Sequence, residues 1–351
     1  MLGMDDKRLQ NLEGVLLCLV VIGIGAVEHP STAKSRAPSA QDAKESSVHI
    51  RFVREFSSPD DVRGERLPIF DRSVDIVAGP AEPHVANDKL VAPYSVATDS
   101  THRVFVTDPG AGVVHIFDFE KSKYSVLGSR DTRLRLPAGV ATDGDDDVYV
   151  TDTSLGVVLV YDSKGKFLRY LGKVEGGESY FQAPIGIAIH AATGHIYVCD
   201  SARHMIIMLD KKGHVLGHFG KRLGGDGPGD FRYPSRIVIA GDELFVLDSG
   251  NSRLQVLDPG GHLRREVRLP EVSASDGLAL DDEKNIYVSD GQLNVINVLR
   301  HDGQFLCKFG LGGARPGELN VPSGLWIESE SLYVADSKNH RVQIFQIEKQ
   351  R

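Results

Sequence analysis

The chain has 351 residues, of which 41% are hydrophobic and 25% are charged, and this composition excludes intrinsic disorder over the whole chain. Its formal net charge of -8 argues against nucleic acid as the main partner, because binding to phosphates needs clustered Lys and Arg. Three Cys are too few for a disulfide framework.

The N-terminus has an apolar segment followed by a polar one. Residues 14–27 read GVLLCLVVIGIGAV, whereas a membrane-spanning helix needs about 20 residues. With Lys7 and Arg8 before it, this run is typical of a signal peptide, and a membrane anchor, or lipidation at Cys18, are the alternatives. Residues 28–47 are rich in Ser, Ala and Pro and predict a flexible linker. We therefore expect an exported protein, periplasmic or extracellular, that is membrane-associated if residues 14–27 are retained.

Residues 65–89 form an insertion ahead of the first repeat. Within it, residues 68–79 read PIFDRSVDIVAG, and Phe70, Val74 and Val77 recur there at helical spacing between an initial Pro and a final Gly. We expect a short amphipathic helix in this insertion.

One strand-like pattern occurs six times after the insertion. Each copy alternates over about five residues, which is typical of a strand, and ends in Asp. Each also has Phe or Tyr at one register, and we expect these six aromatic rings to lie in the core. The copies are VFVTD to Asp108, VYVTD to Asp152, IYVCD to Asp200, LFVLD to Asp248, IYVSD to Asp290 and LYVAD to Asp336.

Three further strands accompany each copy. One strand-like run precedes each copy and begins with Pro in five of the six. A second run ends ten residues after each Asp, and a third closes the repeat. Four strands in about 46 residues are typical of a propeller blade. The sixth copy ends at Arg351 without its fourth strand, and residues 51–57, RFVREFS, match the closing strands of other copies. The sequence therefore predicts an all-β, six-bladed propeller over residues 48–351, with an N-terminal strand that completes the last blade and leaves no open edge.

Residues 333–345, YVADSKNHRVQIF, closely resemble the NHL repeat, and residues 248–258, DSGNSRLQVLD, are similar to it. The resemblance extends over about residues 48–351. It implies a propeller fold and leaves function open, because propellers of this kind mostly bind proteins, while some cleave amidated substrates and some bind RNA.

The candidate site lies where the blades depart from their shared pattern. In a propeller, the connections from strand four to strand one and from strand two to strand three surround one mouth of the central channel. Arg236 stands at a position that is Gly in four other blades. In blades one and five, Tyr94 and Asp276 stand immediately before the equivalent position. Trp326, the only Trp, replaces a small residue. We predict that Arg236, Asp276, Tyr94 and Trp326 bind a ligand at this mouth. The insertion at residues 65–89 is expected on the same face, where it could cover the channel as a partial lid.

Each of these residues also has a structural interpretation. Arg236 and Asp276 lie in adjacent blades and could form an ion pair. Trp326 could pack between blades, Tyr94 could cover only its own loop, and the insertion at residues 65–89 could pack against blade one.

The same pattern bears on metal and catalytic sites. The six Asp residues that end the strands are interpreted as turn caps, which accept backbone N–H groups. No His occupies the register of the channel mouth, and Asp276, even with Glu328 and Asn320, falls short of the six to eight oxygens that calcium needs. We expect no catalytic residue, metal or cofactor, and we interpret Cys199 and Cys307 as buried thiols.

The sequence thus favours a monomeric, non-catalytic propeller that binds a ligand or protein with the loop face around its channel. The alternative is a metal-dependent lyase or lactonase-type hydrolase that acts in the channel.

Overall fold

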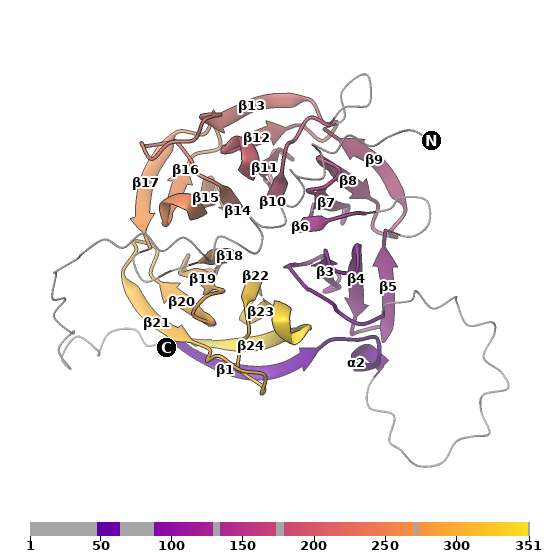
Figure 1. The fold of residues 1–351 in the computed structure, drawn as a ribbon. Coiled ribbons are helices and arrows are strands. Elements are labelled where there is room, and N and C mark those ends of the chain that lie inside the picture. Colours follow the sequence, from indigo (N-terminus) through magenta and orange to yellow (C-terminus); the bar gives the residue numbers. More distant parts are fainter. Residues whose placement is uncertain are drawn as a thin grey trace, which may run out of the picture.

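The computed structural model describes residues 48–63, 88–128, 134–172, 179–269, 272 and 274–349. Its strands form six four-stranded sheets arranged in a ring (Figure 1). The predicted all-β, six-bladed propeller is therefore confirmed. The apolar segment at residues 14–27, the linker and the helix expected over residues 68–79 lie outside the described residues. Within the described residues, no helix has the length and apolar character needed to cross a membrane.

The first three blades run along the chain from the inner to the outer strand. Blade one comprises β2 (Ser95–Thr98), β3 (Val104–Asp108), β4 (Val113–Asp118) and β5 (Lys123–Leu127). Blade two comprises β6 (Pro137–Thr142), β7 (Val148–Asp152), β8 (Val157–Tyr161) and β9 (Phe167–Leu171). Blade three comprises β10 (Pro184–Ile189), β11 (Ile196–Asp200), β12 (Met205–Leu209) and β13 (Val215–Gly220).

Blades four and five follow the same order, whereas blade six differs. Blade four comprises β14 (Pro234–Ala240), β15 (Glu243–Asp248), β16 (Arg253–Leu257) and β17 (Leu263–Arg268). Blade five comprises β18 (Ser275–Leu280), β19 (Ile286–Asp290), β20 (Val295–Leu299) and β21 (Phe305–Phe309). Blade six comprises β22 (Pro322–Glu328), β23 (Ser331–Asp336), β24 (Arg341–Lys349) and, as its outer strand, β1 (Val48–Phe56).

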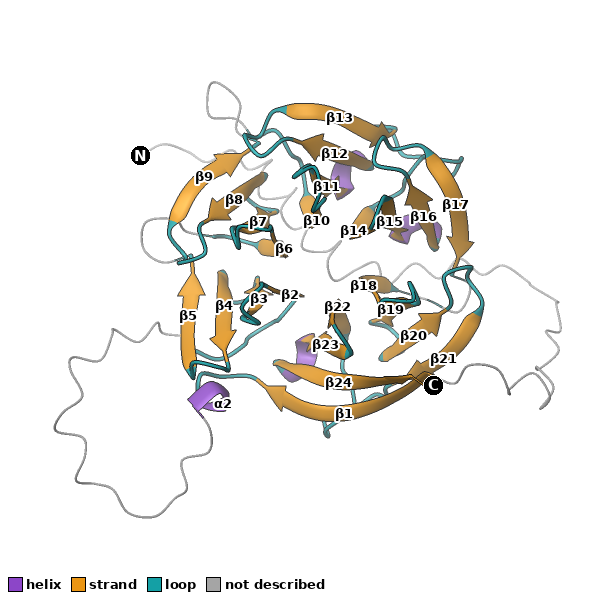
Figure 2. Cartoon of the chain, turned by 180° about the vertical axis from the view of Figure 1, so that it is seen from behind, coloured by secondary structure: helices purple, strands orange, loops and turns teal. Residues whose placement is uncertain are grey.

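Strand β1 closes the ring, as the sequence predicted. It pairs antiparallel with β24 in the sheet order β1-β24-β23-β22, so that the two ends of the described chain share one sheet (Figures 1 and 2). Arg341 of β24 strengthens this junction, because its Nη1 donates to Glu55 Oε2 of β1 at 2.7 Å. A four-residue helix, α2 (Asp60–Arg63), follows β1 directly.

The apolar side chains of the blades form clusters between neighbouring sheets. The six strand-two aromatics all belong to this core, which confirms their predicted role: their exposed fractions are at most 9%. They are Phe105, Tyr149, Tyr197, Phe245, Tyr287 and Tyr333. The strands alternate, and this places one set of side chains against each adjoining blade.

The inner strands come very close to one another at the face where they begin. A Cβ atom added to Gly277 would lie 2.1 Å from the carbonyl oxygen of Ser323 in the next blade. A Cβ on Gly139 would similarly meet the Ile185 carbonyl at 2.3 Å. Only Gly fits such an approach, which explains why Gly is the third residue of the inner strand in four blades. Hydroxyl groups join the blades at the same level, as where Ser289 Oγ donates to the Ser323 carbonyl at 2.8 Å.

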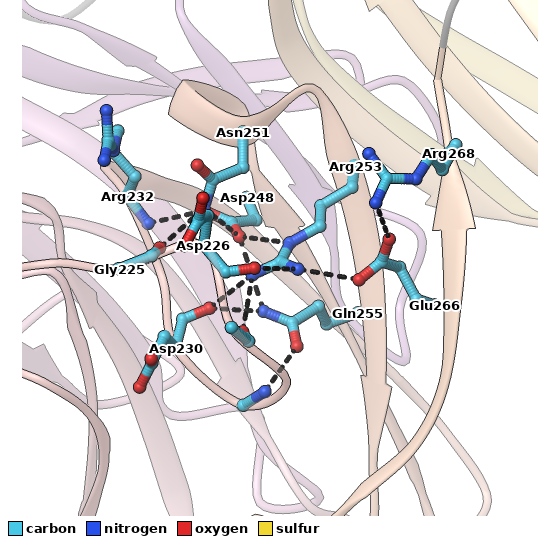
Figure 3. A network of polar contacts seen from close by, with 12 residues as sticks. Gly225, Asp226, Asp230, Arg232, Asp248, Asn251, Arg253, Gln255, Glu266 and Arg268 are labelled. Carbon is cyan, nitrogen blue, oxygen red and sulfur yellow. Dashed lines mark hydrogen bonds and ion pairs between the residues drawn. The ribbon is translucent and has the colours of Figure 1, made fainter.

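The strand-ending Asp residues accept backbone N–H groups, but only Asp108, Asp152 and Asp290 cap the turn that follows them, as predicted. Asp200, Asp248 and Asp336 make no such cap and accept N–H groups from the connection that precedes their blade. Asp200, for example, accepts backbone N–H groups from Gln182 and Ala183 at 3.0 and 2.8 Å. In blade four this role extends into a polar network around Arg253 (Figure 3). Arg253 Nε donates to Asp248 at 2.8 Å, and both side chains are buried.

Candidate functional site

Three of the four predicted site residues meet at the loop face, where the inner strands begin. Tyr94 lies just before β2, Arg236 is the third residue of β14 and Asp276 is the second residue of β18. The guanidinium carbon of Arg236 lies 4.4 Å from the centre of the Tyr94 ring, which is cation–π geometry. Arg236 Nη1 is also 3.3 Å from Tyr94 Oη. Blades one and four are opposite in a ring of six, so this contact crosses the channel.

Arg236 is buried, with 7% of its surface exposed, yet its guanidinium is only partly paired. Nη1 donates to the Ser235 carbonyl at 3.2 Å, whereas Nε has no hydrogen-bond partner among the described residues. No ion pair joins Arg236 to Asp276 in the part of the chain that the structure describes. Arg236 contacts Tyr94 instead of forming the expected ion pair with the adjacent blade.

Electrostatics still couple these three side chains. Burial raises the pKa of the Asp276 carboxyl, while the positive charge of Arg236 acts in the opposite direction. Burial likewise raises the pKa of the Tyr94 hydroxyl, again opposed by Arg236. The loop-face end of the channel is thus filled by an aromatic ring stacked on a cation, with a carboxyl group in the same field.

Trp326 does not join this group. Its indole Nε1 donates to Thr98 Oγ1 at 2.9 Å, and Thr98 donates in turn to Glu328 at 2.9 Å. The ring packs against the apolar clusters on both sides of blade one, as the structural interpretation held. It also lines a cavity of about 450 Å³ in the channel.

This cavity lies beyond Arg236, toward the opposite face. Its wall in blade four starts at Ile237 and reaches Gly241, and Tyr94, Arg236 and Asp276 are absent from the described lining. The remaining wall comes from the later residues of β6, β10, β18 and β22. Sequence reasoning placed all four candidates at one mouth and did not identify this cavity. The signal for it was apolar residues, such as Ile239 and Ile327, near the ends of the inner strands.

The other residues with metal or thiol chemistry are dispersed. Glu328 accepts hydrogen bonds from Thr98 and lies 3.0 Å from His102 Nδ1, away from Asp276 at the loop face. No group of three or more His, Cys, Asp or Glu side chains suited to a metal ion occurs among the described residues. Cys199 is buried, as predicted, whereas Cys307 is only half-buried, because it lies in the outer strand β21.

Family models match two parts of the chain. A model described as a six-bladed β-propeller matches residues 184–294, and the NHL-repeat model matches residues 319–345. A search of curated proteins finds no match.

Solved structures share the fold at low sequence identity. A virginiamycin B lyase from Staphylococcus aureus is 15% identical with a TM-score of 0.54, over 73% of this chain and 95% of that one. A gluconolactonase from Xanthomonas campestris is 15% identical with a TM-score of 0.57, over 74% and 87%. A protein of unknown function from Bacteroides thetaiotaomicron is 15% identical with a TM-score of 0.59, over 75% and 71%. Such identities show the fold alone. The chain is a six-bladed β-propeller, and its residues 319–345 match the NHL repeat.

Proposed function

We propose that this propeller is a non-catalytic binding protein that recognises a protein or peptide partner with its loop face. The observation that supports this most is a set of large apolar side chains exposed on that face. Leu223 and Leu311 lie in connections from strand four to strand one and are 96% and 67% exposed. Leu293, between strands two and three of blade five, is 49% exposed, and Tyr233, just before β14, is 39% exposed. Exposed apolar side chains on the loops of this face favour a protein interface.

Tyr94, Arg236 and Asp276 form the centre of the proposed interface. The contact between Tyr94 and Arg236 fills the channel there, so a partner would meet a ring backed by a cation. The Asp276 carboxyl, which is only half-buried, offers an acceptor to polar groups of the partner. Rigid blades hold these loops in place, and irregular loops on a rigid scaffold suit recognition.

The test is a selection of displayed peptides against the full chain, followed by binding assays on variants. The double variant Leu223→Asp/Leu311→Asp should abolish binding of the selected peptides. The matched control is Leu168→Asp/Leu216→Asp, because these leucines are also exposed, at 40% and 46%, but lie on the outer strands β9 and β13. Equal loss in both double variants, or in neither, would contradict a loop-face interface.

The central residues are tested in the same assay. Arg236→Ala together with Tyr94→Ala should remove peptide binding without unfolding the domain. Unchanged binding would exclude these residues from the interface.

Export through residues 14–27, a monomeric state and the absence of nucleic acid among the partners belong to the same proposal. The acidic net charge of -8 supports the last point. The alternative of a metal-dependent lyase or lactonase-type hydrolase has two fold neighbours with such names in its favour. About one zinc or calcium ion retained per chain after dialysis would favour that alternative over a purely binding role.

A further inference from the structure

We propose a second binding site, separate from the loop face, that takes a small, neutral, ring-containing molecule in the cavity lined by Trp326. The cavity has a volume of about 450 Å³, within the range of about 300–1,000 Å³ typical of ligand pockets. It is formed by the ends of β6, β10, β14, β18 and β22, so that five rigid sheets hold its walls. This site does not depend on the loop-face function.

The wall of the cavity is mainly aliphatic. Ile189, Ile239, Leu280 and Ile327 line it, and each keeps part of its surface exposed although it belongs to an inner strand. Apolar surface that stays in contact with water inside a concave site gains free energy when a ligand covers it. The wall therefore favours an apolar ligand.

Trp326 gives this wall a flat aromatic surface. The indole occupies a position that Ala or Val holds in the other blades, and its N–H is already bonded to Thr98 at 2.9 Å. The hydrogen bond fixes the ring and leaves no indole donor for a ligand. What Trp326 offers is the apolar face of the ring, and such a face packs well against another ring.

The charged groups at the rim favour a neutral ligand. Asp281 is buried and its carboxylate already accepts from the side chain of Asn285 at 2.9 Å and from Tyr287 Oη at 3.3 Å. Lys284 donates to Glu243 at 2.6 Å. Asp282 is exposed and adds a further negative charge to the lining. Lys284, the cation at this rim, is thus already paired, and the carboxylates of Asp281 and Asp282 leave the rim negative. An anionic ligand is therefore disfavoured.

The single Trp makes the site directly observable. Because the whole chain contains one Trp, all indole fluorescence originates at the cavity wall. The probe is N-phenylnaphthylamine, a neutral aromatic amine that brightens in apolar sites and accepts energy from indole. We expect its emission to rise on addition to the full chain while the Trp326 emission falls in parallel. Anilinonaphthalene sulfonate, which has the same rings plus an anionic group, should bind at least about tenfold more weakly.

Variants locate the probe. Ile239→Asp places a charge in the wall and should weaken binding about tenfold or more, and Ile239→Asn is the milder change if the Asp variant fails to fold. Leu216→Asp makes the same kind of change on the outer strand β13 and should leave binding unaltered. Probe emission without loss of Trp326 emission, equal effects of Ile239→Asp and Leu216→Asp, or no binding at all would overturn the proposal.

Discussion

Replacing Arg253 by Leu should destabilise blade four strongly, because the guanidinium is the centre of a buried polar network. Its side chain is 3% exposed and that of Asp248 is fully buried. Arg253 donates to Asp248 at 2.8 Å and to Glu266 at 2.6 Å. It also donates to the backbone carbonyls of Asp226 at 2.8 Å, of Gly227 at 3.0 Å and of Asp230 at 2.8 Å, which lie in the connection from blade three. One side chain thus ties that connection to the core of the next blade (Figure 3).

The expected magnitude follows from this burial. Removing one partner of a buried ion pair costs about 3–5 kcal/mol, because the other charge is left uncompensated. Asp248 would keep its bonds from the Arg232 N–H at 2.6 Å and from Asn251 at 2.8 Å, which places the expected loss near the lower limit, at about 3 kcal/mol. Arg253→Lys keeps the charge and loses the planar set of donors. We therefore expect its free energy of unfolding to lie between that of the wild type and that of the Leu variant.

Equilibrium unfolding in urea, followed by circular dichroism, measures these losses. The control is Arg268→Ala, because Arg268 pairs with Glu266 in the same network at 3.1 Å but is 79% exposed. An exposed pair is worth at most about 1 kcal/mol. A loss for Arg253→Leu no larger than that of the Arg268 control would refute the view that burial gives this network its strength.

Three further predictions concern other parts of the propeller. Gly277→Ala should lower the free energy of unfolding by about 1–3 kcal/mol, because its Cβ would lie 2.1 Å from a carbonyl oxygen of blade six, whereas Gly144→Ala, with no atom within 4 Å, should leave it nearly unchanged. Burial raises the pKa of Asp276, so its ionised form disfavours folding: Asp276→Asn should stabilise the protein near neutral pH, and the gain should vanish as the pH falls to the ordinary Asp value of about 4. A gain that persists in acid would contradict this origin. Alkylation mapped by mass spectrometry should modify the half-buried Cys307 well before the buried Cys199, whose pKa is raised by desolvation; equal rates would contradict the packing described for blade three.

The blade architecture could be predicted because the sequence of each strand shows which of its residues are buried. Alternation, the strand-ending Asp and the fixed offset between strands are local signals, and six repetitions made them unambiguous. Even the pairing of β1 with β24 was predictable, because a missing outer strand in the last repeat had a matching segment at the other end of the chain.

The candidate site was less accessible to such reasoning. The contact between Tyr94 and Arg236 joins opposite blades, and it depends on the width of the ring and on the direction of two long side chains. Neither the width of the ring nor the direction of these side chains can be predicted from the local sequence pattern. Trp326 was recognised as a departure from the repeat, but which part of the channel it lines depends on the walls that four other blades supply.

The pairing of β1 with β24 also determines when the protein can finish folding. Glu55 and Arg341, which join the two strands, are 286 residues apart in the chain. A ribosome that adds about 5–20 residues per second needs about 15–60 s to produce the second after the first. During that interval β1 exists without its partner strand, and Phe56 lacks Val342, with which it pairs in the finished sheet. Strand β1 is therefore synthesised early and pairs late, and the nascent chain must stay free of aggregation until synthesis is nearly complete.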